Sequence, residues 1–431
     1  LLGGPTAINR SDTSPDATRE ILNRVKFGTE GAMFTGVLGG VGKTWTADTT
    51  VIFTGKNNGD GILGEDNGVA DDSVTNSANV NLTVKGNGDD FLAGLTIAGG
   101  TGTDTIELTA NGGSSDFNAT TGVEKILVVD NAVQGSDVTI ALNENIAITT
   151  QPGGIEIDAT ALDGSTTADE VLTVTDNTTL IPVTIKSGGG ADVLDGGNAN
   201  DTIHGNDGAD TIDGNEGLDS LSGGAGNDTF TLNSKAEYVT AYGTDIIDGG
   251  AGTDTLNARY SVTAASTQTA TVSNVEIVYV DTDDGDANDA HTTTFDLATF
   301  SGVTQAWAYN NDSDATNQDI LNISNIPLGT TVGVKGGDAN ANNTFTYLLT
   351  TALTDTATLA LDTAKSDLIT IAGIEALTIS ASGKSTIDEL ATTSALTLTV
   401  NASGKTVLTN IDDVTRTVDA SGSTGDVTIA G

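Results

Sequence analysis

A nine-residue repeat between residues 187 and 231 constrains the fold of this chain more than any other feature. Five consecutive units follow the template G-G-x-G-x-D-x-U-x, in which U is a large apolar residue. They are SGGGADVLD, GGNANDTIH, GNDGADTID, GNEGLDSLS and GGAGNDTFT. Glycine permits positive φ and close backbone approach, so the first six residues of a unit can form a tight turn. The last three residues then form a short strand in which U alone faces inward.

Two such units make one coil of about 18 residues, so the run predicts a parallel β-roll. Its inward-facing residues are expected to be Leu194, Ile203, Ile212, Leu221 and Phe230. The aspartates divide into two columns, because alternate units occupy opposite edges of the roll. Asp192, Asp210 and Asp228 are expected on one edge, and Asp201 and Asp219 on the other.

Cations are expected between the aspartates of each column. Successive coils lie about 4.8 Å apart, so stacked carboxylates repel one another unless a cation separates them. Calcium suits the gap, because it accepts six or more oxygens from carboxylates and turn carbonyls. The turn residues predicted to complete the sites are Gly188, Gly190, Gly197, Gly205, Asp207, Gly208, Gly217, Gly224 and Gly226. A flexible Gly/Asp-rich linker is the alternative, but it would not repeat an apolar residue two positions after each aspartate.

Further copies of the unit lie on both sides of the main run. After an eight-residue insertion, TAYGTDIID and GGAGTDTLN add Asp245 and Asp254 to the candidate ligands. Nearer the N-terminus, KGNGDDFLA and GGTGTDTIE add Asp90 and Asp104. One unit of the main run has Ala199 in place of a turn glycine, so we expect a weaker site there.

The charge of the chain fits a cation-dependent fold. It has 431 residues, with 16 Lys and Arg against 59 Asp and Glu, for a formal net charge of -43. This excludes nucleic-acid binding as a general property and implies strong self-repulsion unless cations are bound. Such charge often indicates disorder, but the chain is 37% hydrophobic and alternates Val, Ile and Leu with Thr. It has no Cys, which leaves calcium as the available cross-link and fits an extracellular protein.

Four segments are predicted along the chain. Residues 1–45 are expected to form an N-terminal helix and arm, 46–180 a β-rich segment, 181–257 the main calcium roll, and 258–431 a C-terminal β-repeat segment. The sequence contains no apolar run of about 18 residues, which a membrane-spanning helix would need. The chain starts with Leu and shows no signal peptide, so we expect a processed form or a fragment.

The expected helix rests on its capping and spacing. Ser14 is a good N-cap, Pro15 suits the first helical position, and Ile21, Leu22 and Val25 form an apolar stripe. The same region carries the basic residues nearest the N-terminus, within 10–43, against few acids.

From about residue 46 onward the pattern is typical of β-strands. VNLTVKG, KILVVD, VTIAL, VLTVT and ALTLTV alternate apolar residues with Thr or other residues. TGVEKILVVD, SNVEIVYVDT and AGIEALTISA share a V/I-E step before an apolar strand. ISASGK, VNASGK and VDASGS recur at spacings of 21 and 18 residues. Repeats of this size suggest solenoid coils, with a β-sandwich as the competing interpretation. The overall expectation is an all-β, calcium-bound parallel β-roll with further solenoid or sandwich segments and one short helix.

No catalytic motif stands out. LGGVGKTW resembles a phosphate-binding loop, but Val37 stands where the first glycine is required. DTDDGDANDAH has Thr292 where an EF-hand needs Glu, so it is either a solvated acidic loop or a calcium site of another kind, and 309–319 is judged in the same way. The two histidines, His204 and His291, belong to no HExxH motif, and there is no GxSxG. We therefore expect that the chain is not an enzyme.

The chain resembles RTX-type bacterial surface-layer proteins. The nonapeptides, the Thr/Val-rich strands, the lack of Cys and the G-[VI]-E and D-A-S-G phrases carry this resemblance. It implies type I secretion, location at the bacterial cell surface, and calcium-dependent self-assembly into a two-dimensional lattice of identical chains. It also implies anchoring to lipopolysaccharide through the N-terminal part, for which the basic region within 10–43 is the candidate. The alternative is an RTX adhesin, or the repeat region of a larger secreted enzyme or toxin.

Overall fold

The structure is a computed structural model in which two compact units are distinguished. It describes residues 25–27, 49–53, 73–75, 81–87, 96–100, 102–110, 114–117, 120–130, 137–142, 154–162, 170–175, 181–234, 245–260, 266–268, 270–282, 292–309, 320–337, 340–349, 354–395, 397–411, 415 and 417–430. The first unit comprises Leu1–Asp210 and Gly214–Asp219, and the second comprises Thr211–Asp213 and Ser220–Gly431. The boundary therefore falls inside the nonapeptide run.

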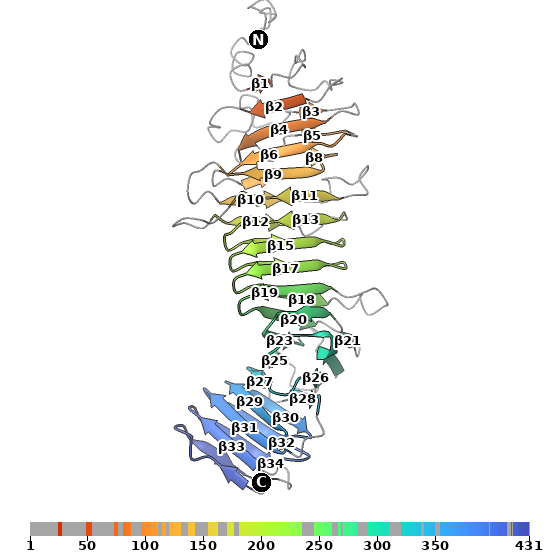
Figure 1. The fold of residues 1–431 in the computed structure, drawn as a ribbon. Coiled ribbons are helices and arrows are strands. Elements are labelled where there is room, and N and C mark those ends of the chain that lie inside the picture. The colour runs from red at the N-terminus through yellow and green to blue at the C-terminus, as the bar shows by residue number, and fades with distance from the viewer. Residues whose placement is uncertain are drawn as a thin grey trace, which may run out of the picture. The chain divides into compact units, whose positions relative to one another are not determined.

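The described regular structure of the first unit consists of short β-strands, stacked like rungs in Figure 1. They are β1 (Val25–Phe27), β2 (Thr49–Phe53), β3 (Ser73–Thr75), β4 (Leu82–Asn87), β5 (Thr96–Ala98), β6 (Thr105–Thr109), β7 (Ser114–Asp116), β8 (Thr120–Thr121), β9 (Lys125–Val129), β10 (Val138–Ala141), β11 (Ile155–Asp158), β12 (Leu172–Thr175), β13 (Val183–Lys186), β14 (Val193–Asp195) and β15 (Thr202–Asp207). From β2 onward neighbours are parallel, in the orders β2-β4-β6-β9-β11-β13-β15, β7-β10-β12-β14 and β3-β5-β8. Parallel strands that pair with the next coil define a β-solenoid.

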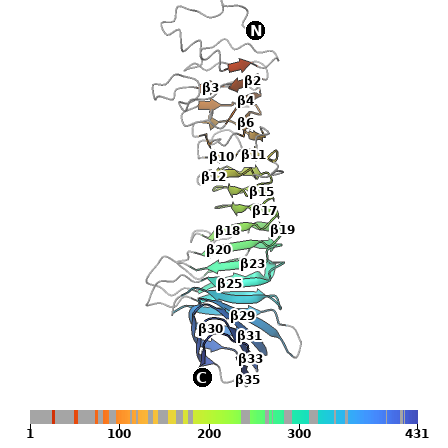
Figure 2. The ribbon, with the colours of Figure 1, turned by 90° about the vertical axis from the view of Figure 1, so that its left-hand side faces the viewer.

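The second unit is built from the same kind of coil (Figure 2). Its elements are β16 (Thr211–Asp213), β17 (Ser220–Ala225), β18 (Thr229–Ser234), β19 (Ile246–Ala251), β20 (Thr255–Tyr260), β21 (Ser266–Gln268), β22 (Thr271–Ser273), β23 (Ile277–Asp281), β24 (Thr292–Asp296), the 3-10 turn η3 (Leu297–Thr299), β25 (Gln305–Tyr309), β26 (Ile320–Ile326), β27 (Thr331–Lys335), β28 (Asn342–Tyr347), β29 (Thr356–Asp362), β30 (Lys365–Ala372), β31 (Ala376–Ser382), β32 (Ser385–Ala391), β33 (Thr397–Ala402), β34 (Thr406–Ile411), β35 (Thr417–Asp419) and β36 (Val427–Ile429). Strands β20, β23, β25, β27, β29, β31 and β33 pair in sequence, all parallel. From β24 to β36 the even-numbered strands form a second parallel sheet, edged by β21.

Buried apolar columns hold the coils of each unit together. In the first unit, in-register partners at most 1% exposed are Val84, Ile106, Ile126, Ile157, Ile185 and Ile203. In the second they are Phe230, Leu256, Val278, Ala306, Val332, Leu359, Ile379 and Val400. The alternating sequence produces these columns, because every second residue of a strand faces inward. The five predicted inward residues of the nonapeptides are confirmed, all at most 2% exposed: Leu194, Ile203, Ile212, Leu221 and Phe230.

The C-terminal repeats are solenoid coils, which decides against the sandwich interpretation. Ala381 pairs with Ala402 in adjacent parallel strands. Ser423 lies 21 residues beyond Ala402 and accepts its N–H through Oγ at 3.0 Å. The A-S-G phrases that begin at Ala381 and Ala402 therefore lie in register in adjacent coils.

The predicted N-terminal helix lies mostly outside the described residues. Ser14, Pro15, Ile21 and Leu22 are not described, while Val25, its last apolar position, lies in strand β1. Strand β1 pairs with β2 in antiparallel fashion, with Val25 opposite Phe53. The basic region within 10–43 is not described apart from Val25–Phe27.

Candidate calcium columns

Aspartates of successive coils are joined by hydrogen bonds through the backbone. In the first unit the N–H of Asp192 donates to Oδ1 of Asp210 at 2.8 Å, 18 residues along the chain. The N–H of Asp201 donates to Oδ1 of Asp219 at 2.8 Å, again 18 residues along. These two bonds confirm the predicted coil length and the separation of the aspartates into two columns.

The eight-residue insertion leaves the column of the second unit intact. The N–H of Asp228 donates to Oδ1 of Asp254 at 2.8 Å, and the two residues are 26 apart in the chain. The extra residues are accommodated between β18 and β19, since Thr229 still pairs with Thr255. The sequence places the eight-residue insertion at residues 232–239, but its first residues, Leu232 and Asn233, continue strand β18.

The first aspartate of a column uses Oδ1 in the same way. The N–H of Leu172 donates to Asp192 at 2.7 Å, and the N–H of Val183 donates to Asp201 at 2.7 Å. Asp104, near the N-terminus, accepts the N–H of Leu82 at 2.6 Å. Each Oδ1 therefore accepts a hydrogen bond from a backbone amide of the preceding coil and helps to hold the two coils together.

The second carboxylate oxygen leaves a polar atom buried without a donor. Oδ2 of Asp192 and Oδ2 of Asp254 make no hydrogen bond, although the two residues are only 1% and 0% exposed. Burial raises the pKa of Asp192 to about 6, against the lowering effect of the Leu172 amide. Burial likewise raises the pKa of Asp254. An ionised carboxylate in such a place is costly unless a cation accompanies it.

A glycine at the first position of the template leaves space between the second carboxylate oxygen of an aspartate and a carbonyl oxygen of the next coil. A methyl group on Gly196 would lie 2.7 Å from Oδ2 of Asp201 and 3.0 Å from the carbonyl oxygen of Gly214. Only glycine leaves this space between carboxylate and carbonyl open. Gly196 and Gly214 were not among the predicted ligands, although the first position of the template marks them.

The predicted turn glycines occupy two kinds of place. Gly197, Gly208, Gly217, Gly224 and Gly226 have positive φ, between 113° and 146°, as the tight turn requires. At Gly208 a side chain would also collide with the carbonyl of Gly190 in the preceding coil.

Three other predicted glycines contact residues of a neighbouring coil. Gly188 packs against the carbonyl of Leu162, and Gly190 against that of Glu170. The carbonyl of Gly205 accepts a hydrogen bond from Oγ of Ser187 at 2.5 Å.

The remaining predicted ligands are less uniform. Asp104 is fully buried, like the aspartates of the main run, whereas Asp245 is half-buried and Asp207 is exposed at the end of β15. Asp90 lies outside the described residues. Ala199 does not have positive φ, so its turn differs from those with glycine. The weaker site expected there stays a prediction.

The donor set of the columns fits calcium. Within the described part of the chain, no three Asp, Glu, His or Cys side chains gather around one point. Each site must therefore combine a few carboxylate oxygens with backbone carbonyls, an all-oxygen set that calcium accepts readily. The acidic loops within 283–291 and 310–319 are not described, so their role stays open.

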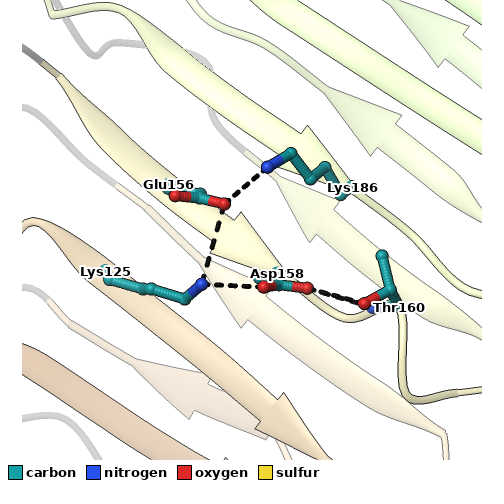
Figure 3. A network of polar contacts seen from close by, with 5 residues as sticks. All are labelled: Lys125, Glu156, Asp158, Thr160 and Lys186. Carbon is teal, nitrogen blue, oxygen red and sulfur yellow. Dashed lines mark hydrogen bonds and ion pairs between the residues drawn. The ribbon is translucent and has the colours of Figure 1, made fainter.

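A different electrostatic arrangement holds the coils from β9 to β13 (Figure 3). Nζ of Lys125 lies 2.7 Å from Oδ2 of Asp158 and 3.7 Å from Oε1 of Glu156. Nζ of Lys186 lies 2.7 Å from the same oxygen of Glu156, and Thr160 donates its hydroxyl to Oδ1 of Asp158 at 2.8 Å. Although partial burial opposes it, the bonds from Lys125 and Thr160 hold the pKa of Asp158 below its ordinary value.

Comparison with known proteins identifies the repeats. Residues 184–203, 204–234 and 240–259 match the model of the RTX calcium-binding nonapeptide repeat. RTX nonapeptide repeats bind calcium, and proteins that carry them are typically secreted. No curated protein and no solved structure matches the chain. Among the described residues, no helix is long and apolar enough to cross a membrane. The fold and the site thus define a calcium-binding repeat protein with an RTX β-roll in a parallel β-solenoid.

Proposed function

We propose that this chain is a structural surface-layer protein that self-assembles on the bacterial cell surface when calcium is present. The observation that carries the proposal is the uniformity of the fold. In both units the described chain forms stacked parallel coils with apolar interiors, and the buried aspartates of the nonapeptides serve the contacts between coils. A stiff scaffold whose rigidity depends on calcium suits a surface lattice.

Charge supplies the switch in this proposal. A net charge of -43 keeps copies of the chain apart at low calcium. Bound calcium neutralises part of that charge and orders the coils, after which identical chains associate. Repeated head-to-tail contacts propagate instead of closing, as a lattice requires. The basic region within 10–43 is the proposed contact with lipopolysaccharide.

Assembly of the purified chain tests the proposal. Light scattering and electron microscopy are carried out from zero to about 10 mM calcium, a range that brackets extracellular affinities. We expect a monomer without calcium and ordered sheets or tubes above a threshold. A chain that stays monomeric throughout contradicts the lattice proposal. The alternative, an RTX adhesin or the repeat region of a larger type I-secreted enzyme or toxin, then takes its place, because the same coils support it equally.

A further inference from the structure

Three glutamates stand in the same structural position, one coil beyond an aspartate. Each is the Glu of a V/I-E step, and its Oε2 accepts the backbone N–H of that aspartate. The pairs are Asp104 with Glu124, Asp254 with Glu276, and Asp355 with Glu375. Within a column, the next aspartate accepts this N–H, so the glutamate replaces it at the end of the column.

The pair at Asp254 contains a buried carboxylate oxygen that lacks a donor. Asp254 is 0% exposed, and its Oδ1 accepts the N–H of Asp228 at 2.8 Å. Its Oδ2 makes no hydrogen bond. A methyl group on Gly249 would lie 2.6 Å from this Oδ2 and would collide with the carbonyl oxygen of Asn274. Oδ2 of Asp254 and the Asn274 carbonyl therefore border the same small space, which Gly249 keeps open.

Glu276 places a second acid next to Asp254. Its Oε2 accepts the N–H of Asp254 at 2.8 Å. Burial and the charge of Glu276 both raise the pKa of Asp254, in that order, against the amide bond from Asp228. Two carboxylates thus lie next to each other beside the Asn274 carbonyl, and among the described residues no Lys or Arg forms an ion pair with either of them.

The pair at Asp104 repeats this arrangement in the other unit. A methyl group on Gly99 would lie 2.6 Å from Oδ2 of Asp104 and would collide with the carbonyl of Gly122. Gly122 precedes its V-E step by one residue, as Asn274 does in the other pair. Oε1 of Glu124 is buried and makes no hydrogen bond. Burial, and to a lesser degree the charge of Asp104, raises the pKa of Glu124.

We propose that Asp254 with Glu276, at the end of an aspartate column, and Asp104 with Glu124 each hold one calcium ion. The carboxylates of each pair and the carbonyl of Asn274 or Gly122 supply protein ligands, an all-oxygen set suited to calcium. Both glutamates lie outside the residues that match the nonapeptide model. These sites would extend calcium binding to coils that lack the repeat, whether or not copies of the chain assemble.

The pair at Asp355 provides an internal control. Glu375 accepts the N–H of Asp355 at 2.8 Å, as in the other pairs. In the sequence, however, Thr350 occupies the place of Gly249 and Gly99, five residues before the aspartate. Thr350 lies outside the described residues, but threonine carries the Cβ that Gly249 and Gly99 lack. We therefore expect this pair to cap its coil without holding calcium.

Replacement of each glutamate by glutamine separates a calcium site from a simple cap. The side-chain carbonyl of Gln still accepts the aspartate N–H, but the negative charge is lost. Calcium bound per full-length chain is counted by equilibrium dialysis, which works for monomers and assemblies alike. We expect Glu276→Gln and Glu124→Gln each to bind one ion fewer than the parent. Glu375→Gln and the exposed control Glu389→Gln are expected to bind the same number as the parent.

Thermal stability provides a second readout, measured in EGTA and with calcium. In EGTA, Glu276→Gln should melt higher than the parent, because it removes repulsion between the half-buried Glu276 and the buried Asp254. Addition of calcium should then raise the melting temperature of Glu276→Gln by less than it raises that of the parent, because the variant binds one ion fewer. Unchanged ion counts in both Glu276→Gln and Glu124→Gln would overturn the proposal and leave the glutamates as caps or proton-sharing pairs. An equal loss in Glu375→Gln would also overturn it. If Glu276→Gln does not fold, Glu124→Gln tests the second copy independently.

Discussion

The coils from β9 to β13 and the nonapeptide coils share a backbone plan but neutralise their acids differently. In the first set Lys125 and Lys186 contact Glu156 and Asp158 on adjacent strands. The stretch 187–234 contains no Lys or Arg. Its aspartates bond backbone amides through Oδ1, and the neutralising charge must come from solution. The apolar column runs unbroken from Ile126 through Ile203.

We infer from this difference that calcium dependence is a local property of a solenoid. The buried apolar column and the parallel ladder serve both kinds of coil alike. What changes is the partner of the buried carboxylate: a lysine that folds with the chain, or a cation whose occupancy depends on its concentration. One chain can thus contain coils that persist without calcium beside coils that require it.

Calcium removal is expected to have the largest effect and to divide the two sets of coils. At millimolar calcium and a dissociation constant near 10⁻⁴ M, each site adds about 1.4 kcal/mol, and the sites sum. EGTA should therefore abolish amide-exchange protection in the coils of 187–231 while much of it persists in β9, β11 and β13. Hydrogen exchange read by mass spectrometry measures both regions in one sample. Equal loss in the two regions would show that the ion pairs do not sustain their coils.

Removal of two column charges should reproduce part of this effect at constant calcium. Asp210→Asn and Asp219→Asn together affect both columns, while the Asn side chains keep an oxygen that can accept the backbone amides. We expect at least two ions fewer per chain, a loss of about 3 kcal/mol at the affinity given above, and no assembly at calcium levels where the parent assembles. Calorimetric titration and light scattering measure these outcomes. The exposed control Asp388→Asn should behave as the parent, and equal calcium uptake by the double variant would refute the column sites.

Acid should act in opposite directions on the two sets of coils when calcium is absent. The folded-state pKa of Asp192 is raised from 3.8 to about 6, so its ionisation opposes folding. That penalty is absent below the unfolded pKa and grows as pH rises through about 6, so acidification from pH 7 to pH 5 should stabilise these coils. The folded-state pKa of Asp158 is lowered instead, so its stabilisation is present above 3.8 and is lost as pH falls further.

Amide exchange in EGTA measures both signs, from pH 7 to pH 5 at Asp192 and below pH 3.8 at Asp158, after correction for the intrinsic pH dependence of exchange. The amide of Leu172, which donates to Asp192, reports on the column, and the amides of β9 and β11 report on the ion pairs. With calcium present the sign at Asp192 should reverse, because protons then compete with the bound ion. Destabilisation at Asp192 on acidification to pH 5 in EGTA would contradict the assignment.

The sequence predicts the nonapeptide coils far better than the ion-paired coils, for a physical reason. The nine-residue period is local, so the position of a residue within the repeat predicts its place in the fold. It predicts that Leu194 and Ile203 are buried, and it assigns Asp192 and Asp201 to their columns. Lys125 and Asp158 are 33 residues apart, with no repeat to set their register. Their contact depends on the length of the intervening connection, which the residue types do not specify.

The V/I-E steps show the same limit. The sequence reveals that the phrase recurs, but not that Glu124, Glu276 and Glu375 accept the amide of an aspartate one coil earlier. The spacing between aspartate and glutamate varies from 20 to 22 residues, so no fixed period connects them. Burial of Oδ2 beside a carbonyl likewise depends on the packing of two coils, which only the structure provides.

Loss of one lysine from the ion-paired coils is expected to have the smallest effect. Lys125→Met keeps most of the aliphatic side chain but removes the charge that contacts Glu156 and Asp158. Partly exposed ion pairs contribute little, and a shared lysine falls at the upper end of that range, so we expect a loss of about 1 kcal/mol. Because calcium plays no part in this contact, the loss should be similar in calcium and in EGTA, and smaller at high salt. Urea unfolding followed by local amide exchange in β9 and β11 measures it.

Lys405→Met, at an exposed position before β34, is the matched control and should change stability by less than about 0.5 kcal/mol. A Lys125→Met chain as stable as this control would show that the ion pairs do not replace calcium. The persistence of these coils in EGTA would then rest on their apolar column alone.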